Sequence, residues 1–256
     1  MSGPVAIVTG ASQGIGFATA VRLARDVGSL VLVARNRAKL EATAAAVKAQ
    51  GAEALIIDLD LSERSAAQQV VAQTLARFGR IDALLNIAGA VPQIDLFEMT
   101  DEQWDAGMAL KLHGARRLTL EAWPALKAAK GCVVLMSGNS ALFPKAPYAA
   151  VGTINAAIIA LAKAFADRGV ADGVQVNSVL PGAVMTGRRR SYLEHWAPLH
   201  DMTVEEATEK FPHEAGIARY GAAEDIAELM AFLVSPQARW MTGTAVRMDG
   251  GEVKSV

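Results

Sequence analysis

A cluster of glycines follows the first apolar run of the chain. The segment Thr9-Gly10-Ala11-Ser12-Gln13-Gly14-Ile15-Gly16 has the spacing G-x-x-x-G-x-G and stands between a run of β-branched residues and a stretch with helical spacing. Glycines allow a tight turn and a close approach of backbone to phosphate, and the first turn of a helix offers free N–H groups. We therefore expect a dinucleotide pyrophosphate at Gly10, Ser12, Gln13, Gly14, Ile15 and Gly16.

The end of the second apolar run bears on which dinucleotide is bound. It reads Val33-Ala34-Arg35-Asn36-Arg37, with Ala34 and Arg35 where an acidic residue would bind the ribose 2′-hydroxyl of NAD. A small residue leaves room for a 2′-phosphate, and a guanidinium pairs with phosphate through two hydrogen bonds. The sequence favours NADP(H), with NAD(H) as the alternative. Arg35 and Arg37 are also consistent with a solvated start to the next helix.

Seven short apolar runs alternate with alanine-rich segments of helical spacing. The runs are continuous in Val, Ile and Leu, which is typical of strands covered on both faces. Alternating strands and helices imply right-handed crossovers. The expected fold is a single α/β domain over residues 1–256 with a doubly wound parallel sheet. Its expected strands are Val5–Thr9, Leu30–Ala34, Ala54–Asp58, Ala83–Asn86, Val133–Ser137, Val174–Leu180 and Ala245–Met248.

Composition narrows the class of protein. The 256 residues are 52% hydrophobic and 20% charged, which is typical of a folded domain, and the net charge of −1 excludes a general nucleic-acid binder. The single cysteine, Cys132, excludes an intrachain disulfide and a multi-cysteine zinc site. The opening residues lack a signal-peptide pattern, and no uninterrupted apolar stretch reaches about eighteen residues. We expect a cytoplasmic protein with no membrane partner.

One segment, residues 187–221, interrupts the alternation. It follows the sixth expected strand and contains Arg188-Arg189-Arg190, three histidines and Trp196. An insertion at the carboxyl end of a sheet is a natural substrate lid. The three arginines are candidates to hold a carboxylate, a phosphate or a coenzyme A group, and a solvated lid surface is the alternative. Trp196, Tyr192 and Leu193 are candidates for an apolar wall beside the substrate.

Four further motifs, together with the glycine turn, resemble those of the short-chain dehydrogenase/reductase family over nearly the whole chain. They are Asp60-Leu61, Asn86-Ile87-Ala88-Gly89, Pro181-Gly182-Ala183-Val184-Met185-Thr186 and Met248-Asp249-Gly250-Gly251. The resemblance implies a Rossmann-like subunit with a seven-stranded sheet and helices on both faces. It also implies a homo-oligomer, either a tetramer or a dimer.

The same resemblance implies roles in cofactor binding. Asp60, beside Leu61, would accept a hydrogen bond from the exocyclic amine of the adenine. The motif at the end of the fourth strand departs from the family's N-N-A-G, because Ile87 replaces the second asparagine. The residues of these motifs expected to line the cofactor site are Asp60, Leu61, Asn86, Ala88, Gly89, Pro181, Gly182, Val184 and Thr186.

The catalytic pattern that the resemblance implies is missing. The family uses Asn, Ser, Tyr and Lys, with the last two spaced Y-x-x-x-K. When the segment from Asn155 to Leu161 is matched to the family's helix, Asn155 takes the lysine position and Val151 the tyrosine position. Gly138 then takes the serine position, and Lys111, in Lys111-Leu112-His113-Gly114, takes the asparagine position.

The replacements keep the same chemical types at other positions, which leads to a hypothesis. Tyr148 lies about one helical turn before Val151, so it would reach the same cleft and exchange the proton. Lys111 would lower the pKa of Tyr148, Asn155 would keep a hydrogen bond to the ribose, and Ser137 would orient the substrate oxygen. Asn139 and Ser140 are further candidates to orient it. A solvated lysine, a packing tyrosine and a serine that caps a turn are the alternatives.

Two functions fit these observations. The first is an NADP-preferring oxidoreductase that moves a hydride between nicotinamide and a carbonyl or alcohol carbon of a small molecule. The second is a cofactor-binding protein without redox activity, such as a sensor, a scaffold, a lyase or an isomerase. The missing catalytic residues favour the second, and the nicotinamide-side residues Pro181, Gly182 and Thr186 favour the first. The four histidines lack zinc-site spacing, so no metal is expected.

Overall fold

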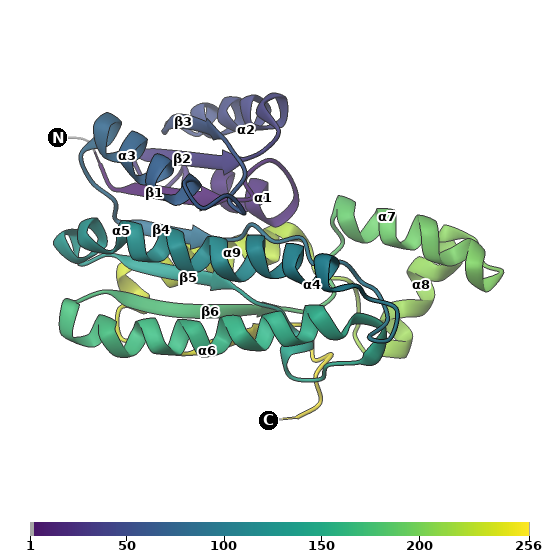
Figure 1. Cartoon of the computed structure of the whole chain (residues 1–256). Helices are drawn as coiled ribbons and strands as arrows, with labels where there is room; N and C mark the ends of the chain where they lie inside the picture. Colours follow the sequence, from purple (N-terminus) through teal and green to yellow (C-terminus); the bar gives the residue numbers. More distant parts are fainter. Residues whose placement is uncertain (1–2, 256) are drawn as a thin grey trace.

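Seven parallel strands form one sheet in the order β3-β2-β1-β4-β5-β6-β7 (Figure 1). The structure is a computed structural model and describes residues 3–255. The strands are β1 (Val5–Thr9), β2 (Ser29–Ala34), β3 (Glu53–Asp58), β4 (Ala83–Asn86), β5 (Cys132–Met136), β6 (Gln175–Pro181) and β7 (Ala245–Met248). The prediction of a seven-stranded, doubly wound sheet is confirmed.

Four of the predicted strands differ from the observed ones at an end. β2 and β3 each begin one residue earlier, β5 runs from Cys132 to Met136, and β6 runs from Gln175 to Pro181. Polar residues account for part of this difference. Ser29 is buried and in register with Val5, and Glu53 is in register with Ser29, so these two polar residues extend β2 and β3 by one residue each.

Three helices cover each face of the sheet (Figure 1). One face carries α3, α5 and α6, and the other carries α1, α2 and α9. Their bounds are α1 (Gly14–Leu23), α2 (Arg37–Ala49), α3 (Ala66–Phe78), α5 (Ala115–Ala129), α6 (Ala149–Asp172) and α9 (Ala223–Val234).

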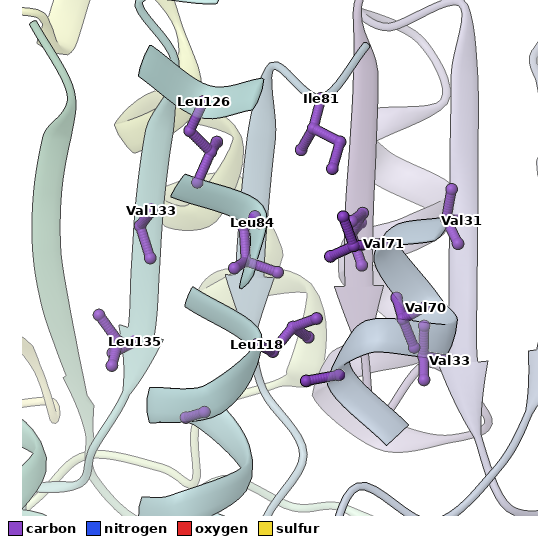
Figure 2. Close-up of a cluster of buried hydrophobic side chains, with 14 of the residues drawn as sticks. Val31, Val33, Val70, Val71, Ile81, Leu84, Leu118, Leu126, Val133 and Leu135 are labelled. Atoms are coloured by element: carbon purple, nitrogen blue, oxygen red, sulfur yellow. The ribbon is translucent and has the colours of Figure 1, made fainter. Parts of the chain in front are cut away.

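The core on the α3, α5 and α6 side consists of branched aliphatic side chains. Figure 2 shows Leu118 and Leu126 of α5 beside Leu84 of β4 and the side chains of β5. Both leucines are fully buried, as their helical spacing on one face requires. Because strands such as β1 are buried on both faces, their sequences are continuously apolar rather than alternating.

The order of the strands fixes where a ligand can bind. β1 lies between β2 and β4, so the chain crosses over in opposite directions from it. In such sheets a crevice opens at the carboxyl ends of the strands where the direction reverses. The Thr9 hydroxyl joins the two strands there, because it accepts hydrogen bonds from the N–H groups of Ile87 and Ala88, each at 2.9 Å.

A π-helical segment lies beside this crevice. The helix α4 (Asp101–Gly107) continues as the segment Met108–Gly114, which leads directly into α5. Single π-helical turns within longer helices are frequent at functional sites, because they change the direction of side chains locally. Lys111 lies in this segment.

The segment 187–221, predicted to be a lid, forms helices beside the carboxyl ends of the strands. It contains α7 (Gly187–Trp196), a short 3-10 helix (Ala197–His200) and α8 (Val204–Ala215). These helices project from the main body (Figure 1). They have a small apolar cluster of their own around Leu193, Ala197 and Ala207.

One helical segment, Ala146–Asp172, which comprises α6 and the turn before it, is long and apolar enough to cross a membrane by length and composition. In the fold, the side chains of Ile158, Ala162 and Ala166 of this helix are buried in the core against the sheet. Its apolar composition is therefore explained by packing within the domain.

Candidate functional site

A groove of about 500 Å³ opens at the carboxyl ends of β1, β2 and β4. It runs from the loop after β2, past the glycine turn, to the start of α7. The predicted cofactor-binding residues among its lining are Gly10, Ser12, Gln13, Gly14, Ile15, Gly16, Arg35, Asp60, Leu61, Ala88, Gly89 and Thr186. The structure thus brings together most of the positions that the sequence motifs singled out.

The glycine turn leaves backbone where side chains would collide. Gly10 has φ +67°, and a Cβ atom there would lie 3.0 Å from the backbone nitrogen of Ala88. At Gly16 a Cβ atom would lie 2.1 Å from the carbonyl oxygen of Gly10. Both positions therefore require glycine. The turn keeps the bare backbone surface on which a pyrophosphate is held in dinucleotide-binding folds.

The helix α1 begins in this turn without a side-chain cap. Gln13 is at the N-cap position but makes no capping hydrogen bond, and the first turn contains no acidic residue. The first N–H groups of a helix have no partner within the helix and carry a partial positive charge. At Gly14, Ile15 and Gly16 they border the groove, so this end of α1 fits an anionic group.

Basic side chains border the far end of the groove. Arg35 lies 3.5 Å from the Asp60 carboxylate and is 69% exposed, so it is free to turn toward a ligand. Lys39, in the first turn of α2, donates to the Gln13 side chain at 2.8 Å and also lines the groove. Arg37 instead pairs with Glu41 and Asp58. Arg35 and Lys39 could hold a phosphate at the end of a bound dinucleotide.

The Asp60 carboxylate stays ionised at this rim. Burial alone would raise the pKa of Asp60, but hydrogen bonds from the N–H and hydroxyl groups of Ser62 and the charge of Arg35 outweigh burial and lower it. An ionised carboxylate can accept a hydrogen bond from an amine such as that of adenine.

Lys111 lies at the floor of the groove, where it crosses from the π-helical segment to α6. Its ammonium donates to the Oδ1 atom of Asn155 and, at 3.2 Å, to the carbonyl oxygen of Ser137. Asn155 is almost fully buried, and its Nδ2 atom donates to the Ser140 hydroxyl at 2.9 Å. Two acceptors therefore fix the ammonium, and its third N–H has no acceptor among the described residues.

The electrostatics of Lys111 follow from its position. Burial, with a smaller effect of the nearby Arg188 guanidinium, lowers the pKa of Lys111 to about 7. No carboxylate lies within ion-pair distance of its ammonium among residues 3–255. An amine with a pKa near neutrality can give up or take a proton at working pH.

Two glycines make room for this arrangement. A Cβ atom at Gly89 would lie 3.0 Å from the Cδ atom of Lys111, and one at Gly138 would lie 2.7 Å from the Nδ2 atom of Asn155. Gly138 takes the position of the family's serine in the alignment above. A side chain at position 138 would collide with Asn155, so the observed position of the Asn155 side chain requires glycine at position 138.

Ser137 and Asn155 are both occupied by contacts within the protein. The Ser137 hydroxyl donates to the backbone carbonyl of Asn155 at 2.8 Å, which fastens the end of β5 to α6. Both polar atoms of the Asn155 side chain have protein partners, Lys111 and Ser140. Their roles toward a ribose or a substrate oxygen remain predictions.

Tyr148 behaves differently from the expectation. It lies just before α6, half-buried, and the pKa of Tyr148 is raised, first by burial and then by Glu252 and Tyr192, with Arg189 acting in the opposite direction. The prediction that Lys111 lowers the pKa of Tyr148 is therefore wrong. In the described part of the chain, the hydrogen-bonding partners of Lys111 are Asn155 and Ser137. A proton-donating role of Tyr148 stays a prediction.

Four of the predicted cofactor-binding residues lie outside the lining of the groove, as do the predicted catalytic residues Ser137, Tyr148 and Asn155. Asn86 is buried and donates to the Thr119 hydroxyl at 3.1 Å, so it joins β4 to α5. Pro181 ends β6, Val184 pairs with Gly221, and Gly182 lies against Asp249 and Glu252. These three residues belong to the loop that leads from β6 to the lid, and contact with a cofactor stays a prediction for them.

The motifs did not identify several residues that line the groove. Arg188, a candidate to hold an anionic group or to be a solvated lid residue, instead donates to the carbonyl oxygens of Gly89 at 3.3 Å and Val91 at 2.6 Å. It therefore fastens α7 to the loop after β4, across the mouth of the groove. Lys39 had a signal in the sequence, because it lies one helical turn after Arg35. Met136 and Leu110, which add an apolar patch, had none.

Comparison with known proteins agrees with this geometry. Residues 10–252 match the family described as enoyl-(acyl carrier protein) reductase. The chain is 31% identical over 258 residues to the short chain dehydrogenase/reductase AacuN of Aspergillus aculeatus, covering 98% of this chain and 96% of that protein. It is also 31% identical over 247 residues to the short-chain reductase protein NovJ of Streptomyces niveus, covering 96% and 93%.

Solved structures show the same fold. L-sorbose reductase from Gluconobacter frateurii, complexed with NADPH and L-sorbose, superposes with a TM-score of 0.95 at 28% identity, over 100% of this chain and 98% of that one. A variant of the actinorhodin polyketide ketoreductase, solved with NADPH, gives a TM-score of 0.94 at 27% identity and covers 100% of both chains.

Proposed function

The chain belongs to the short-chain dehydrogenase/reductase family, and we propose that it is an NADPH-dependent reductase of a small carbonyl compound. The observation that carries this proposal is the position of Lys111. Its ammonium lies at the floor of a groove that also contains the glycine turn and the basic rim. The relatives and the NADPH-bound structural neighbours support the reaction class and the cofactor.

The residues present fit NADP(H). The uncapped end of α1 and the bare glycine turn would hold the pyrophosphate, and Arg35 with Lys39 would hold the 2′-phosphate. Asp60 would accept from the adenine amine. When bound, NADPH supplies the hydride that reduces the carbonyl carbon.

We propose that Lys111 supplies the proton in this reaction. The family's catalytic tyrosine position holds Val151, so the phenol is missing from its usual place. Asn155 and Ser137 hold the ammonium of Lys111, and its remaining N–H donates to the carbonyl oxygen as that oxygen gains negative charge. The amine then regains its proton from solvent. Met136 and Leu110 make this part of the groove apolar, which strengthens the interaction between the ammonium and the oxygen.

The alternative donor is Tyr148, and one comparison separates the two. NADPH oxidation at the reduced-nicotinamide absorbance band would be followed with a panel of ketones, keto acids and aldehydes for Lys111→Met, Tyr148→Phe and, as a control, the exposed Lys48→Met. We expect kcat of Lys111→Met to fall at least about a hundredfold, which is typical for loss of a proton donor. We expect Tyr148→Phe to keep kcat within about tenfold. The reverse order would assign the proton to Tyr148.

The same panel decides the second function considered from the sequence. Saturable NADPH binding without turnover of any carbonyl compound would contradict the reductase and favour a cofactor-binding protein without redox activity.

We also propose that the protein forms a dimer or a tetramer and that it is located in the cytoplasm. Light scattering after size-exclusion chromatography measures the mass of the assembly.

A further inference from the structure

The guanidinium of Arg189 lies among aromatic rings of the lid. Its central carbon is 4.0 Å from the ring centre of Phe211, 5.1 Å from that of Tyr192 and 5.5 Å from that of Tyr220. Its Nε and Nη2 atoms are buried and lack a hydrogen-bond partner. A guanidinium stays charged at working pH, so burying it without an acceptor carries a cost that its surroundings must offset.

The other arginines of the described chain show how unusual this is. Arg188, beside it on α7, donates to two backbone carbonyls, and Arg190 on its other side is exposed. Eight further arginines pair with carboxylates: Arg22, Arg35, Arg37, Arg77, Arg80, Arg168, Arg219 and Arg247. Among the described residues, Arg189 is thus the arginine with buried donors that have no hydrogen-bond acceptor.

The geometry of the Arg189 guanidinium indicates the chemical class of acceptor that its unpaired donors fit. The Nε and Nη2 atoms form one edge of the guanidinium, and this edge matches the two oxygens of a carboxylate or phosphate. The Tyr220 hydroxyl nearby is also buried without a partner, and its ring stacks on that of Phe211 at 5.5 Å between ring centres. Donors from two side chains therefore lack an acceptor in the same part of the lid.

The guanidinium of Arg189 lies outside the groove but close to it. It is absent from the lining of the groove that holds the glycine turn. Tyr220, whose ring centre lies 5.5 Å from the guanidinium carbon, lines a second hollow together with Thr186 and Gly187, which also line the groove. The charge of Arg189 also favours the ionised phenol of Tyr148. Tyr192, which lies under the guanidinium, also influences Tyr148. An acceptor held by Arg189 would therefore lie on the lid side of the groove.

We propose that Arg189 and Tyr220 bind an anionic group, a carboxylate or a phosphate, carried by the carbonyl substrate. This inference rests on the proposed reductase function, because it names the class of carbonyl compound reduced. It assigns to Arg189 a role in substrate selection, while Lys111 handles the proton.

A purely structural role makes different predictions. In that case the stacking of Arg189 on Phe211 and Tyr192 joins α7 to α8 through cation–π contacts alone. Replacing Arg189 would then lower the melting temperature and change the rates with charged and neutral substrates alike. Anion binding instead predicts a loss confined to the charged substrates.

Matched substrate pairs separate the two. With NADPH, kcat/KM would be measured for acetoacetate against methyl acetoacetate and for dihydroxyacetone phosphate against dihydroxyacetone. We expect the wild-type protein to prefer the anionic member of one pair by at least about tenfold, and that pair identifies carboxylate or phosphate. Arg189→Met should lower this preference about tenfold or more through KM, and Tyr220→Phe should lower it less.

Two further variants complete the kinetic design. Arg189→Lys keeps the positive charge but loses the two parallel donors, so we expect an intermediate preference for the anionic substrate. This variant keeps the proposal testable if Arg189→Met folds poorly. Arg190→Met removes an exposed charge from the same helix, and we expect it to leave the preference unchanged. Equal losses with both members of each pair, or an equal effect of Arg190→Met, would overturn the proposal.

A binding measurement distinguishes failure of this inference from failure of the proposed function. Titration calorimetry with acetoacetate and with dihydroxyacetone phosphate would be carried out on the NADP⁺-saturated protein and its Arg189→Met variant. Anion binding that is lost in the variant supports the inference even if no carbonyl in the panel is reduced. Equal binding to both proteins, or none to either, overturns it, whatever the outcome for reduction.

Discussion

Lys111 and Asn155 touch each other although they lie on different helices, and in the alignment that we infer from the sequence each takes the position of the other's residue type in the family. The ammonium of Lys111 donates to the Oδ1 atom of Asn155. In that alignment, which we propose, the lysine and the asparagine have exchanged positions. The exchange keeps an ammonium beside an amide at the floor of the groove and moves the charge from α6 to the π-helical segment.

This exchange can be tested by reversing it. Asn155→Lys alone places a second ammonium beside that of Lys111 in a buried position, so we expect its melting temperature to fall by several degrees. Lys111→Asn combined with Asn155→Lys should recover at least half of that loss. Thermal unfolding of the two single variants and the double variant gives the coupling between the positions, which we expect to be about 1 kcal/mol or more. Additive effects would show that the two residues act independently.

The pKa of Lys111 predicts the pH dependence of catalysis. The protonated amine is the proton donor for reduction, and its pKa is about 7. We therefore expect kcat/KM for carbonyl reduction to fall as pH rises through about 7, and kcat/KM for alcohol oxidation to rise over the same range. In Lys111→Met this inflection should disappear. Rate profiles between pH 5.5 and 9, roughly the range of a neutral titration, measure it; an inflection that persists in the variant would point to another donor.

The same pKa affects stability. The unfolded chain has a lysine of ordinary pKa, 10.5, whereas the folded protein has one of about 7, so between these values the unfolded state binds more protons. The free energy of unfolding contributed by Lys111 therefore rises with pH from about 7 to about 10. We expect the melting temperature of the wild type, relative to Lys111→Met, to increase by about 3 °C or more from roughly pH 6 to pH 9. A difference that is constant with pH, as expected for exposed Lys48→Met, would contradict the lowered pKa.

Arg35 should decide between the two cofactors. Arg35→Ser removes a guanidinium at the rim of the groove, and we expect it to weaken NADPH binding about ten- to a hundredfold while changing NADH binding less than about threefold. Fluorescence titration of each nucleotide measures this. Arg37→Ser is the matched control, because Arg37 pairs with Glu41 and Asp58 instead. Equal weakening of both nucleotides by Arg35→Ser would indicate a role without selectivity for the phosphate.

The fold was predictable because burial on both faces of the sheet leaves a direct trace in the sequence. β1 and β5 are continuous apolar runs, and three of the seven strands were located at both ends. The errors of one residue at the start of β2 and β3 arose at polar positions, Ser29 and Glu53, which pair with each other in the sheet. A pattern based on hydrophobicity cannot detect a polar residue that is satisfied by its neighbours.

The lining of the groove at the glycine turn was also predictable, because Gly10 to Gly16 are consecutive in one turn. The proton-handling side was not. Lys111 and Asn155 are 44 residues apart, and only the folded chain shows that they touch. The pKa of Tyr148 depends on Glu252, which lies near the other end of the chain, so even its direction of change could not be inferred from nearby residues.

The hydrogen bonds from Arg188 to Gly89 and Val91 connect the first turn of the lid to the rim of the groove. We expect a molecule as long as a dinucleotide to leave only after these hydrogen bonds break, and a small product to leave while they are intact. We therefore expect the order of departure to be fixed, with the alcohol leaving first and the oxidised nucleotide last. We therefore expect release of the nucleotide, which requires this connection to open, to limit the turnover rate. The chemical step at Lys111 would be faster.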